Sequence, residues 1–158
     1  MKNTDKIIKI AKDIGYAFIV TQTDGLMGRP MRMAEITEEG KAYFYTVYET
    51  NKVDEMERNP DVLVLFADTS GQDYISAQGK ASFSFDNDKI DEFWSVANNA
   101  FFTEGKKTKG LCLIEVSMTH VEAWDTTKNM LQIAWDISFS MRDGHQANLG
   151  EQISADFH

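Results

Sequence analysis

The residues best suited to chemistry lie in the segment Phe44–Lys52, FYTVYETNK, where one pattern changes into another. Its first half alternates aromatic and small side chains with period 2, which is typical of a half-buried strand. Its second half leads into a short helical pattern. Thr50, Asn51 and Lys52 therefore bring a hydroxyl, an amide and a cation to the N-terminus of a helix. This combination favours the binding of an anion such as a phosphate.

A second interpretation of the same residues needs no ligand. Asn51 is a suitable N-cap, and Asp54 and Glu55 in the following turn complement the positive end of the helix dipole. Lys52 is then an ordinary solvated side chain. A chain with 25 acidic and 16 basic residues has a net charge of -9, so a local group of cations needs a reason. Both interpretations stay open on residue types alone.

Two arginines precede this segment. Arg29 and Arg32 lie at the start of the predicted strand Met31–Thr37. Period 2 places Arg32 on the same face as Ala34 and Ile36. A charge on an apolar face requires a partner, and a bound phosphate would supply one. The alternative interpretation is that both arginines are ordinary charged residues of the surface.

Composition limits the class of protein. A length of 158 residues suits one domain with a sizeable core. The acidic balance argues against a nucleic-acid partner. No apolar run approaches the length of a membrane span, and the charged N-terminus lacks the core of a signal peptide. We therefore expect a cytoplasmic protein without a nucleic-acid or membrane partner.

No residue pattern identifies a catalytic group or a metal site. The single cysteine, Cys112, lies in an apolar run and is expected to be a buried strand residue. His120, His145 and His158 are far apart and lack metal-ligand spacing.

The hydrophobic patterns predict a mainly β protein, a β-barrel with flanking helices. A turn is expected at Asp24, Gly25 and Gly28, and the segment 130–141 fits either a helix or a strand. The expected strands are Tyr16–Gln22, Met31–Thr37, Ala42–Val47, Val62–Ala67, Tyr74–Phe85 and Leu111–Asp125. The expected helices are Thr4–Ile14, Lys52–Arg58 and Asp86–Asn99. We expect one domain over residues 1–143 and a polar C-terminal tail over residues 144–158.

The two stretches described first resemble the flavin-binding split barrels related to pyridoxamine 5′-phosphate oxidase. The segment Phe44–Lys52 aligns without a gap on the pattern F-Y-T-N-x-x-S-R-K, and Pro30–Ile36 resembles the preceding strand, of type R-x-V-L-L-K. Gly28–Met31 and the strand end Val121–Asp125 resemble the general stress protein 26 branch more closely. The resemblance runs from about Ile7 to Asp125.

This resemblance implies a split β-barrel of the FMN-binding type and a homodimer that holds two flavins where its subunits meet. It implies FMN as the cofactor. The matching cofactor-binding positions are Arg32, Met33 and Ala34 in the first strand, Tyr45 and Thr46 beside the flavin, Thr50, Asn51 and Lys52 at the phosphate, and Trp124 near the flavin.

Departures from the oxidase pattern argue against oxidation of pyridoxamine phosphate. The oxidases' substrate-binding lysine falls at Thr37, and their R-x-H group falls at residues 130–132, which are Met, Leu and Gln. A flavin-contacting arginine falls at Ala134, and a glutamine falls at Tyr74. Each lost charged hydrogen bond is worth about 1.5–3 kcal/mol, so together these losses would disable that activity.

We therefore expect an FMN-binding protein, a flavin-dependent oxidoreductase of the general stress protein 26 type, with an unknown small-molecule or electron-transfer partner. One alternative is a module that binds or stores flavin without turnover. Another is a stress-related dimer whose pocket is vestigial. A deazaflavin or a haem in the same pocket also stays open.

Overall fold

The structure, a computed structural model, describes residues 2–125 and 151–157. Its strands are β1 Tyr16–Thr23, β2 Gly25–Arg32, β3 Glu35–Ile36, β4 Lys41–Val47, β5 Asp61–Asp68, β6 Asp73–Ser84, β7 Leu111–Asp125 and β8 Glu151–Asp156. Its helices are α1 Asn3–Ile14, α2 Asn51–Arg58 and α3 Asn87–Phe93, with short 3₁₀ helices η1 Val96–Ala100 and η2 Gly105–Lys107.

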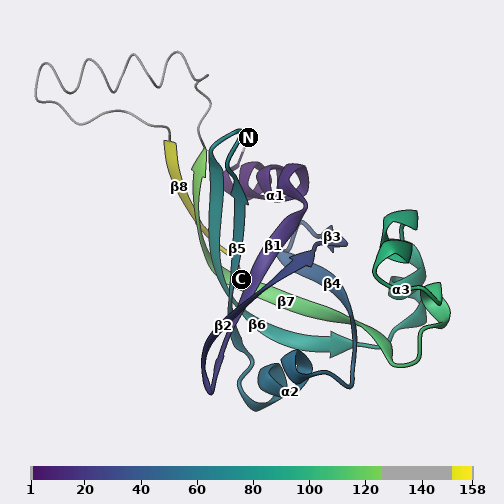
Figure 1. The fold of residues 1–158 in the computed structure, drawn as a ribbon. Helices are drawn as coiled ribbons and strands as arrows, with labels where there is room; N and C mark the ends of the chain where they lie inside the picture. Colours follow the sequence, from purple (N-terminus) through teal and green to yellow (C-terminus); the bar gives the residue numbers. More distant parts are fainter. Residues whose placement is uncertain (1, 126–150, 158) are drawn as a thin grey trace, which may run out of the picture.

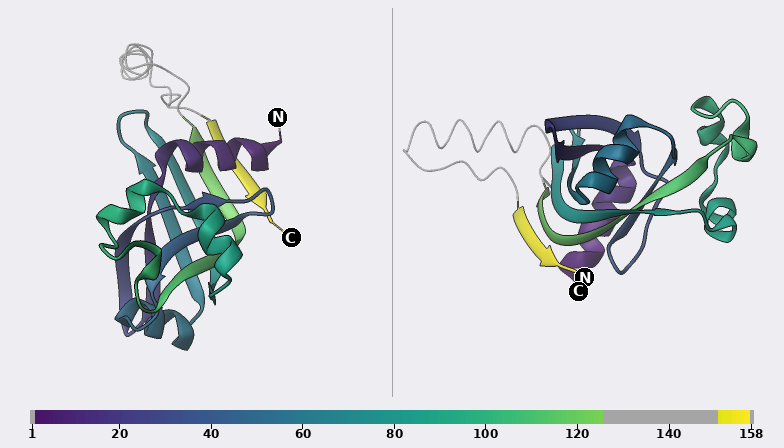
Figure 2. Two further views of the ribbon diagram at one scale, coloured as in Figure 1. Left: turned by 90° about the vertical axis from the view of Figure 1, so that its right-hand side faces the viewer. Right: turned by 90° about the horizontal axis from the view of Figure 1, so that it is seen from below.

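The strands form one antiparallel sheet that curls round on itself (Figures 1 and 2). The strand order is β2-β1-β5-β6-β7-β4-β3, with β8 paired to β7 off this path. Strands β2 and β3 stand at opposite ends of the order, yet only Met33 and Ala34 separate them in the sequence. The two ends of the sheet must therefore meet, which confirms the predicted mainly β, split-barrel fold.

Strand β7 is where the barrel splits. It pairs with β6 along most of its length. On its other side it pairs first with β4, through residues 111–117, and then with β8, through residues 120–125. The β6–β7 register shifts between Gln78 and Gly79, and a Cβ at Gly79 would lie 2.7 Å from Val116 Cγ1. The bulge thus brings the two strands close together at the point where β7 changes its partner.

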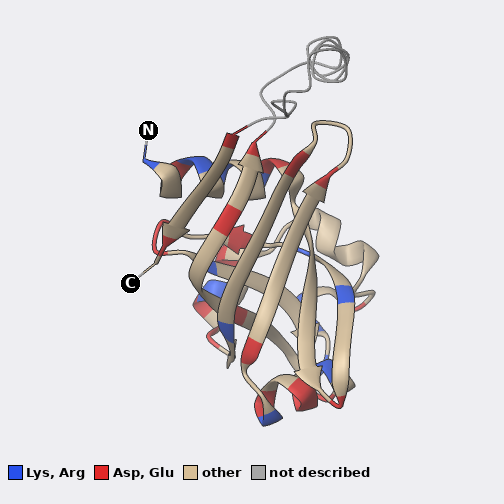
Figure 3. Cartoon of the chain, turned by 90° about the vertical axis from the view of Figure 1, so that its left-hand side faces the viewer, with Lys and Arg blue, Asp and Glu red and all other residues tan. Residues whose placement is uncertain are grey.

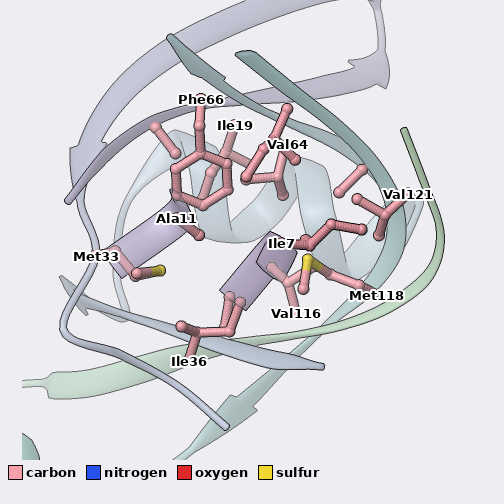
Figure 4. Packing of buried hydrophobic residues seen from close by; sticks show 14 of the residues in the cluster. Ile7, Ala11, Ile19, Met33, Ile36, Val64, Phe66, Val116, Met118 and Val121 are labelled. Carbon is pink, nitrogen blue, oxygen red and sulfur yellow. The ribbon is translucent and has the colours of Figure 1, made fainter. Parts of the chain in front are cut away.

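The core lies inside the curl, against helix α1 (Figure 4). Ile7 and Ala11 lie one turn apart on the buried face of α1 and pack among strand residues such as Ile19, Phe66 and Val121. Helix α1 ends at Gly15, whose φ of +72° is the left-handed conformation that glycine adopts without strain. The inner face of the sheet is therefore filled by the protein's own side chains.

Helix α2 is fixed to the barrel by an ion pair. Glu55 accepts hydrogen bonds from both terminal nitrogens of Arg29, at 2.7 and 2.9 Å, and from Thr21 Oγ1 at 2.7 Å. Val53 and Met56 are the buried residues of this helix. The N-terminus of α2 is thereby held beside strands β2 and β4.

Three sequence expectations differ from the structure. The predicted strand Met31–Thr37 is interrupted, because Met33 turns into the core between β2 and β3. Gly28 lies within β2 rather than in a turn. The predicted helix Asp86–Asn99 ends at Phe93, where Trp94 becomes extended and its ring contacts Tyr45.

The C-terminal residues also differ from the expected polar tail. Glu151–Asp156 form strand β8, in which Ile153 is buried against the core. Phe157 follows it and donates its backbone N–H to the Thr119 carbonyl at 2.9 Å. The segment 130–141, for which helix and strand were both expected, lies outside the described residues.

We predict that Glu55→Gln lowers the free energy of unfolding by about 1.5–3 kcal/mol at pH 7, because a charge-assisted hydrogen-bond pair is lost. The Arg29 guanidinium, with help from Thr21, lowers the pKa of Glu55 to about 2. A lowered carboxyl pKa stabilises the fold above the unfolded value of about 4.3, and this contribution is lost as the pH falls toward 2. Urea denaturation of the wild type and the variant between pH 7 and pH 2 tests this prediction. If the difference between their free energies of unfolding did not decrease in acid, the ion pair would not be the source of the stability.

We also predict that Gly40→Ala loosens strand β8. A Cβ at Gly40 would collide with the ring of Phe157, whereas one at Gly25 would meet no atom within 4 Å. Both glycines have positive φ, +77° and +102°, so Gly25→Ala is a matched control for backbone strain. Gly40→Ala should cost about 1 kcal/mol more stability than the control. Hydrogen exchange should show faster exchange of the β8 amides in that variant alone, and equal effects in both would exclude the Phe157 contact as the cause.

Candidate functional site

A cavity of about 270 Å³ lies where β2, β4, the start of α2 and the segment after α3 meet. Five of the positions predicted to bind the cofactor line it: Arg32, Tyr45, Thr46, Thr50 and Lys52. Asn98, Phe101 and Phe102, which the sequence analysis did not single out, line it as well. The cavity thus joins strand, helix and 3₁₀ residues that are distant in the sequence.

Two cations face this cavity without a carboxylate partner in the described part of the chain. Arg32 Nη1 donates to Asn98 Oδ1 at 3.1 Å, which leaves the charge of Arg32 uncompensated. Burial, with a contribution from the charge of Arg29, lowers the pKa of Lys52. A bound anion would compensate both charges, and a chain of net charge -9 offers carboxylates in abundance elsewhere.

The start of helix α2 adds a further positive feature. Thr50 is the N-cap residue, and its carbonyl accepts from the N–H groups of Val53 and Asp54, each at 3.1 Å. The N–H groups of Asn51 and Lys52 precede the first intrahelical bond. They lie at the positive end of the helix dipole beside the cavity. The expectation that Asn51 is the cap is wrong: Asn51 is the first helical residue and its side chain is exposed.

One wall of the cavity is aromatic and rigid. The Tyr45 hydroxyl donates to the Ile90 carbonyl at 2.6 Å, and its ring contacts Trp94 and Phe102 edge to face. Burial raises the pKa of Tyr45 to about 12, so its hydroxyl stays protonated at neutral pH. Tyr45 therefore offers a ring surface rather than an acid or a base.

Four predicted positions lie outside this cavity. Met33 is buried in the main core, and Ala34 packs against a second cluster that contains Tyr43 and Tyr45. Asn51 lines a different, more open hollow at the start of α2. Period 2 predicted that Arg32 shares a face with Ile36. It does not, because the strand is interrupted at Met33 and Ala34.

Trp124 is the fourth of these positions. Thr46 in the cavity pairs with Cys112, and Trp124 lies twelve residues further along the same strand. At about 3.3 Å per residue, that separation is about 40 Å of strand. Trp124 is instead 38 % exposed, beside Tyr74 on the outer face of the sheet.

Other parts of the described structure offer less chemistry. A larger hollow of about 480 Å³ lies over β1, β5 and β6, where Lys80 and Asp61 form an ion pair at 2.6 Å. Cys112 is fully buried, and burial raises the pKa of its thiol to about 11. Within residues 2–125 and 151–157, no group of three or more metal-ligating side chains is assembled. No helix in those ranges is both long and apolar enough to cross a membrane.

Solved structures with the same fold come from several bacteria. A protein assigned as a general stress protein 26 from Jannaschia sp. CCS1 superposes with a TM-score of 0.80 at 21 % identity, over 98 % of each chain. The general stress protein 26 of Bacillus anthracis str. Sterne gives 0.69 at 22 % identity, over 78 % of this chain and 94 % of its own. A general stress FMN/FAD binding protein from Xanthomonas citri gives 0.69 at 20 % identity, over 80 % and 91 %.

Comparison with curated protein sequences finds no match. A sequence model of the family described as "Pyridoxamine 5′-phosphate oxidase like" matches residues 2–148. This match covers nearly the whole chain and agrees with the curled antiparallel sheet. The chain therefore belongs to the pyridoxamine 5′-phosphate oxidase-like family.

Proposed function

We propose that this protein binds FMN and acts as a flavin-dependent oxidoreductase of the general stress protein 26 type. The observation that carries the proposal is the pair of uncompensated cations, Arg32 and Lys52, in one cavity at the start of α2. A phosphate dianion would satisfy both cations and the free N–H groups of the helix. The FMN/FAD binding protein of Xanthomonas citri, which has the same fold, supports a flavin as the ligand.

The residues present fit this cofactor. Arg32, Lys52 and the start of α2 would hold the phosphate, and Tyr45, Phe101 and Phe102 would contact apolar parts of the ligand. A bound flavin supplies the redox chemistry, because it accepts and donates electrons. The protein's own part is to bind and orient the ligand and to limit the access of water.

A second function is favoured by one observation, the lack of a carboxylate or an imidazole among the described residues that line the cavity. Arg32 and Lys52 are cationic, and the hydroxyl of Tyr45 is engaged with the Ile90 carbonyl. A module that carries flavin without turnover of its own is therefore the alternative. Oxidation of pyridoxamine phosphate is not proposed, since Thr37, at the oxidases' lysine position, forms part of the β3–β4 turn.

We further propose that the protein is a homodimer formed through the outer face of the sheet. The apolar residues of this outer face are Phe18, Val20, Leu63, Leu65, Ala67, Tyr74 and Trp124 from β1, β5, β6 and β7. Figure 3 shows this side of the molecule, where acidic and basic residues gather mainly at the strand ends. Phe18 is 51 % exposed and stands directly opposite Leu65. A dimer would cover this apolar surface and would let the partner subunit's Trp124 approach the ligand, which explains its distance from the cavity within one chain.

We predict that the double variant Arg32→Ala, Lys52→Ala weakens FMN binding at least tenfold, because each charged hydrogen bond contributes about 1.5–3 kcal/mol. The affinity for riboflavin, which lacks the phosphate, should fall much less in this variant. Lys107→Ala with Lys109→Ala removes the same charge from an exposed loop and serves as the control. Fluorescence titration measures each affinity, and an unchanged FMN affinity in the cavity variant would contradict the phosphate assignment.

Turnover is tested on the holoprotein. Mass spectrometry of the small molecule released on denaturation identifies the ligand as FMN, another flavin, a deazaflavin or a haem. Bleaching of the flavin by NADH or NADPH, followed by repeated reoxidation, supports the oxidoreductase. Bound FMN that no nicotinamide nucleotide reduces favours the flavin-carrying alternative.

We predict that Phe18→Glu converts the homodimer into a monomer, because the charge would be buried in an apolar interface. Phe85→Glu is the matched control, since Phe85 is 54 % exposed but lies beyond the outer face, next to Tyr48. Light scattering after size-exclusion chromatography measures the mass. A monomeric wild-type protein, or the same mass for all three proteins, would refute this interface.

A further inference from the structure

Asn98 is the most unusual polar residue of the cavity. It is 3 % exposed, and its neighbours Ala97 and Asn99 are exposed. Its Oδ1 accepts from Arg32 Nη1 at 3.1 Å. Its Nδ2 has no hydrogen-bond partner among the described residues, although it is fully enclosed.

The orientation of this amide follows from Arg32. A guanidinium only donates hydrogen bonds, so the amide oxygen must face it. The opposite orientation would set two donors against each other and leave the oxygen unpaired. The unpaired group at this position is therefore a donor, and a buried donor without an acceptor costs free energy unless a ligand supplies the acceptor.

The backbone holds Asn98 firmly in this position. The N–H of Asn98 donates to the Ser95 carbonyl at 3.0 Å, and the carbonyl of Asn98 accepts from the N–H groups of Phe101 and Phe102, each at 3.0 Å. Ser95 Oγ is also buried without a partner, but Ser95 does not line the cavity. Among the described residues, Asn98 is thus the one that both lines the cavity and has a buried donor without a partner.

We propose that Asn98 is a specificity-determining residue, which orients Arg32 through Oδ1 and donates from Nδ2 to the phosphate of the bound flavin. This inference rests on the proposed function. Nδ2 and Oδ1 are bonded to the same carbon, and Oδ1 lies 3.1 Å from Arg32 Nη1. One phosphate, with several acceptor oxygens, can therefore accept from both Nδ2 and the guanidinium. Asn98 therefore favours FMN over riboflavin without adding a third positive charge to the site.

The test measures FMN and riboflavin affinities by fluorescence titration for the wild type, Asn98→Leu and Asn98→Asp. Asn98→Leu should weaken FMN binding about tenfold, which corresponds to the loss of one hydrogen bond of about 1.4 kcal/mol. Asn98→Asp keeps an acceptor for Arg32 but sets a negative charge beside the phosphate, so a loss of at least a hundredfold is expected at pH 8. Riboflavin affinity should change less than threefold in both variants.

The matched controls are Asn99→Leu and Asn99→Asp, which make the same changes at the exposed neighbouring residue and should leave both affinities within twofold. The riboflavin affinity of each Asn98 variant also reports whether its cavity is intact. As a second readout, inorganic phosphate should raise the melting temperature of the wild type but not that of Asn98→Asp.

Each result decides between distinct conclusions. Equal losses for FMN and riboflavin would assign Nδ2 to the ring or the ribityl chain and overturn the phosphate role. Unchanged FMN affinity in Asn98→Leu would overturn the inference and leave the proposed function standing. A wild-type protein that binds neither flavin would refute the proposed function itself.

Discussion

The ion pair between Arg29 and Glu55 is the interaction on which the candidate site depends. Lys52 and Glu55 lie three residues apart on α2, a spacing at which opposite charges normally pair. Both oxygens of Glu55 are instead occupied by Arg29 and Thr21. Lys52 is therefore left without its natural helical partner. The same bond that fixes α2 to the barrel keeps a cation available at the cavity.

Two nearby arginines of β2 therefore have different roles, Arg29 in the stability of the fold and Arg32 in the proposed binding of the ligand. Arg29 is paired with Glu55, and its charge adds to the effect of burial, which lowers the pKa of Lys52. Arg32, three residues later on β2, is oriented by the neutral amide of Asn98 and keeps its full charge. The distinction cannot be read from residue type, because both arginines lie in one short segment. It depends on which carboxylates the folded chain brings within reach.

The sequence predicted the strands well wherever a continuous apolar run defined them, and β7 begins and ends at Leu111 and Asp125, as expected. Arg32 and Lys52 stood out because cations are scarce in an acidic chain and because the family pattern places them near a phosphate. The interruption at Met33 could not be predicted, because a buried methionine fits the alternating pattern of a continuous strand as well as it fits a break in the strand. Strand β8 was missed because Ile153 and Ala155 alone mark its inner face. Asn98 could not be found, because its burial arises only when η1 packs against β2 and β4.

The end of the long bent strand has a consequence for how this fold can vary. Asp125 and Glu151 are direct cross-strand partners, and Lys6 Nζ from α1 lies 2.7 Å from a carboxylate oxygen of each. The end of β7 and the start of β8 are therefore tied to each other and to helix α1 by one ammonium group. Two carboxylates directly opposite each other on paired strands would otherwise repel. A protein of this fold that loses the lysine is expected to hold its last strand less tightly, unless one of the two carboxylates is also replaced by a neutral residue.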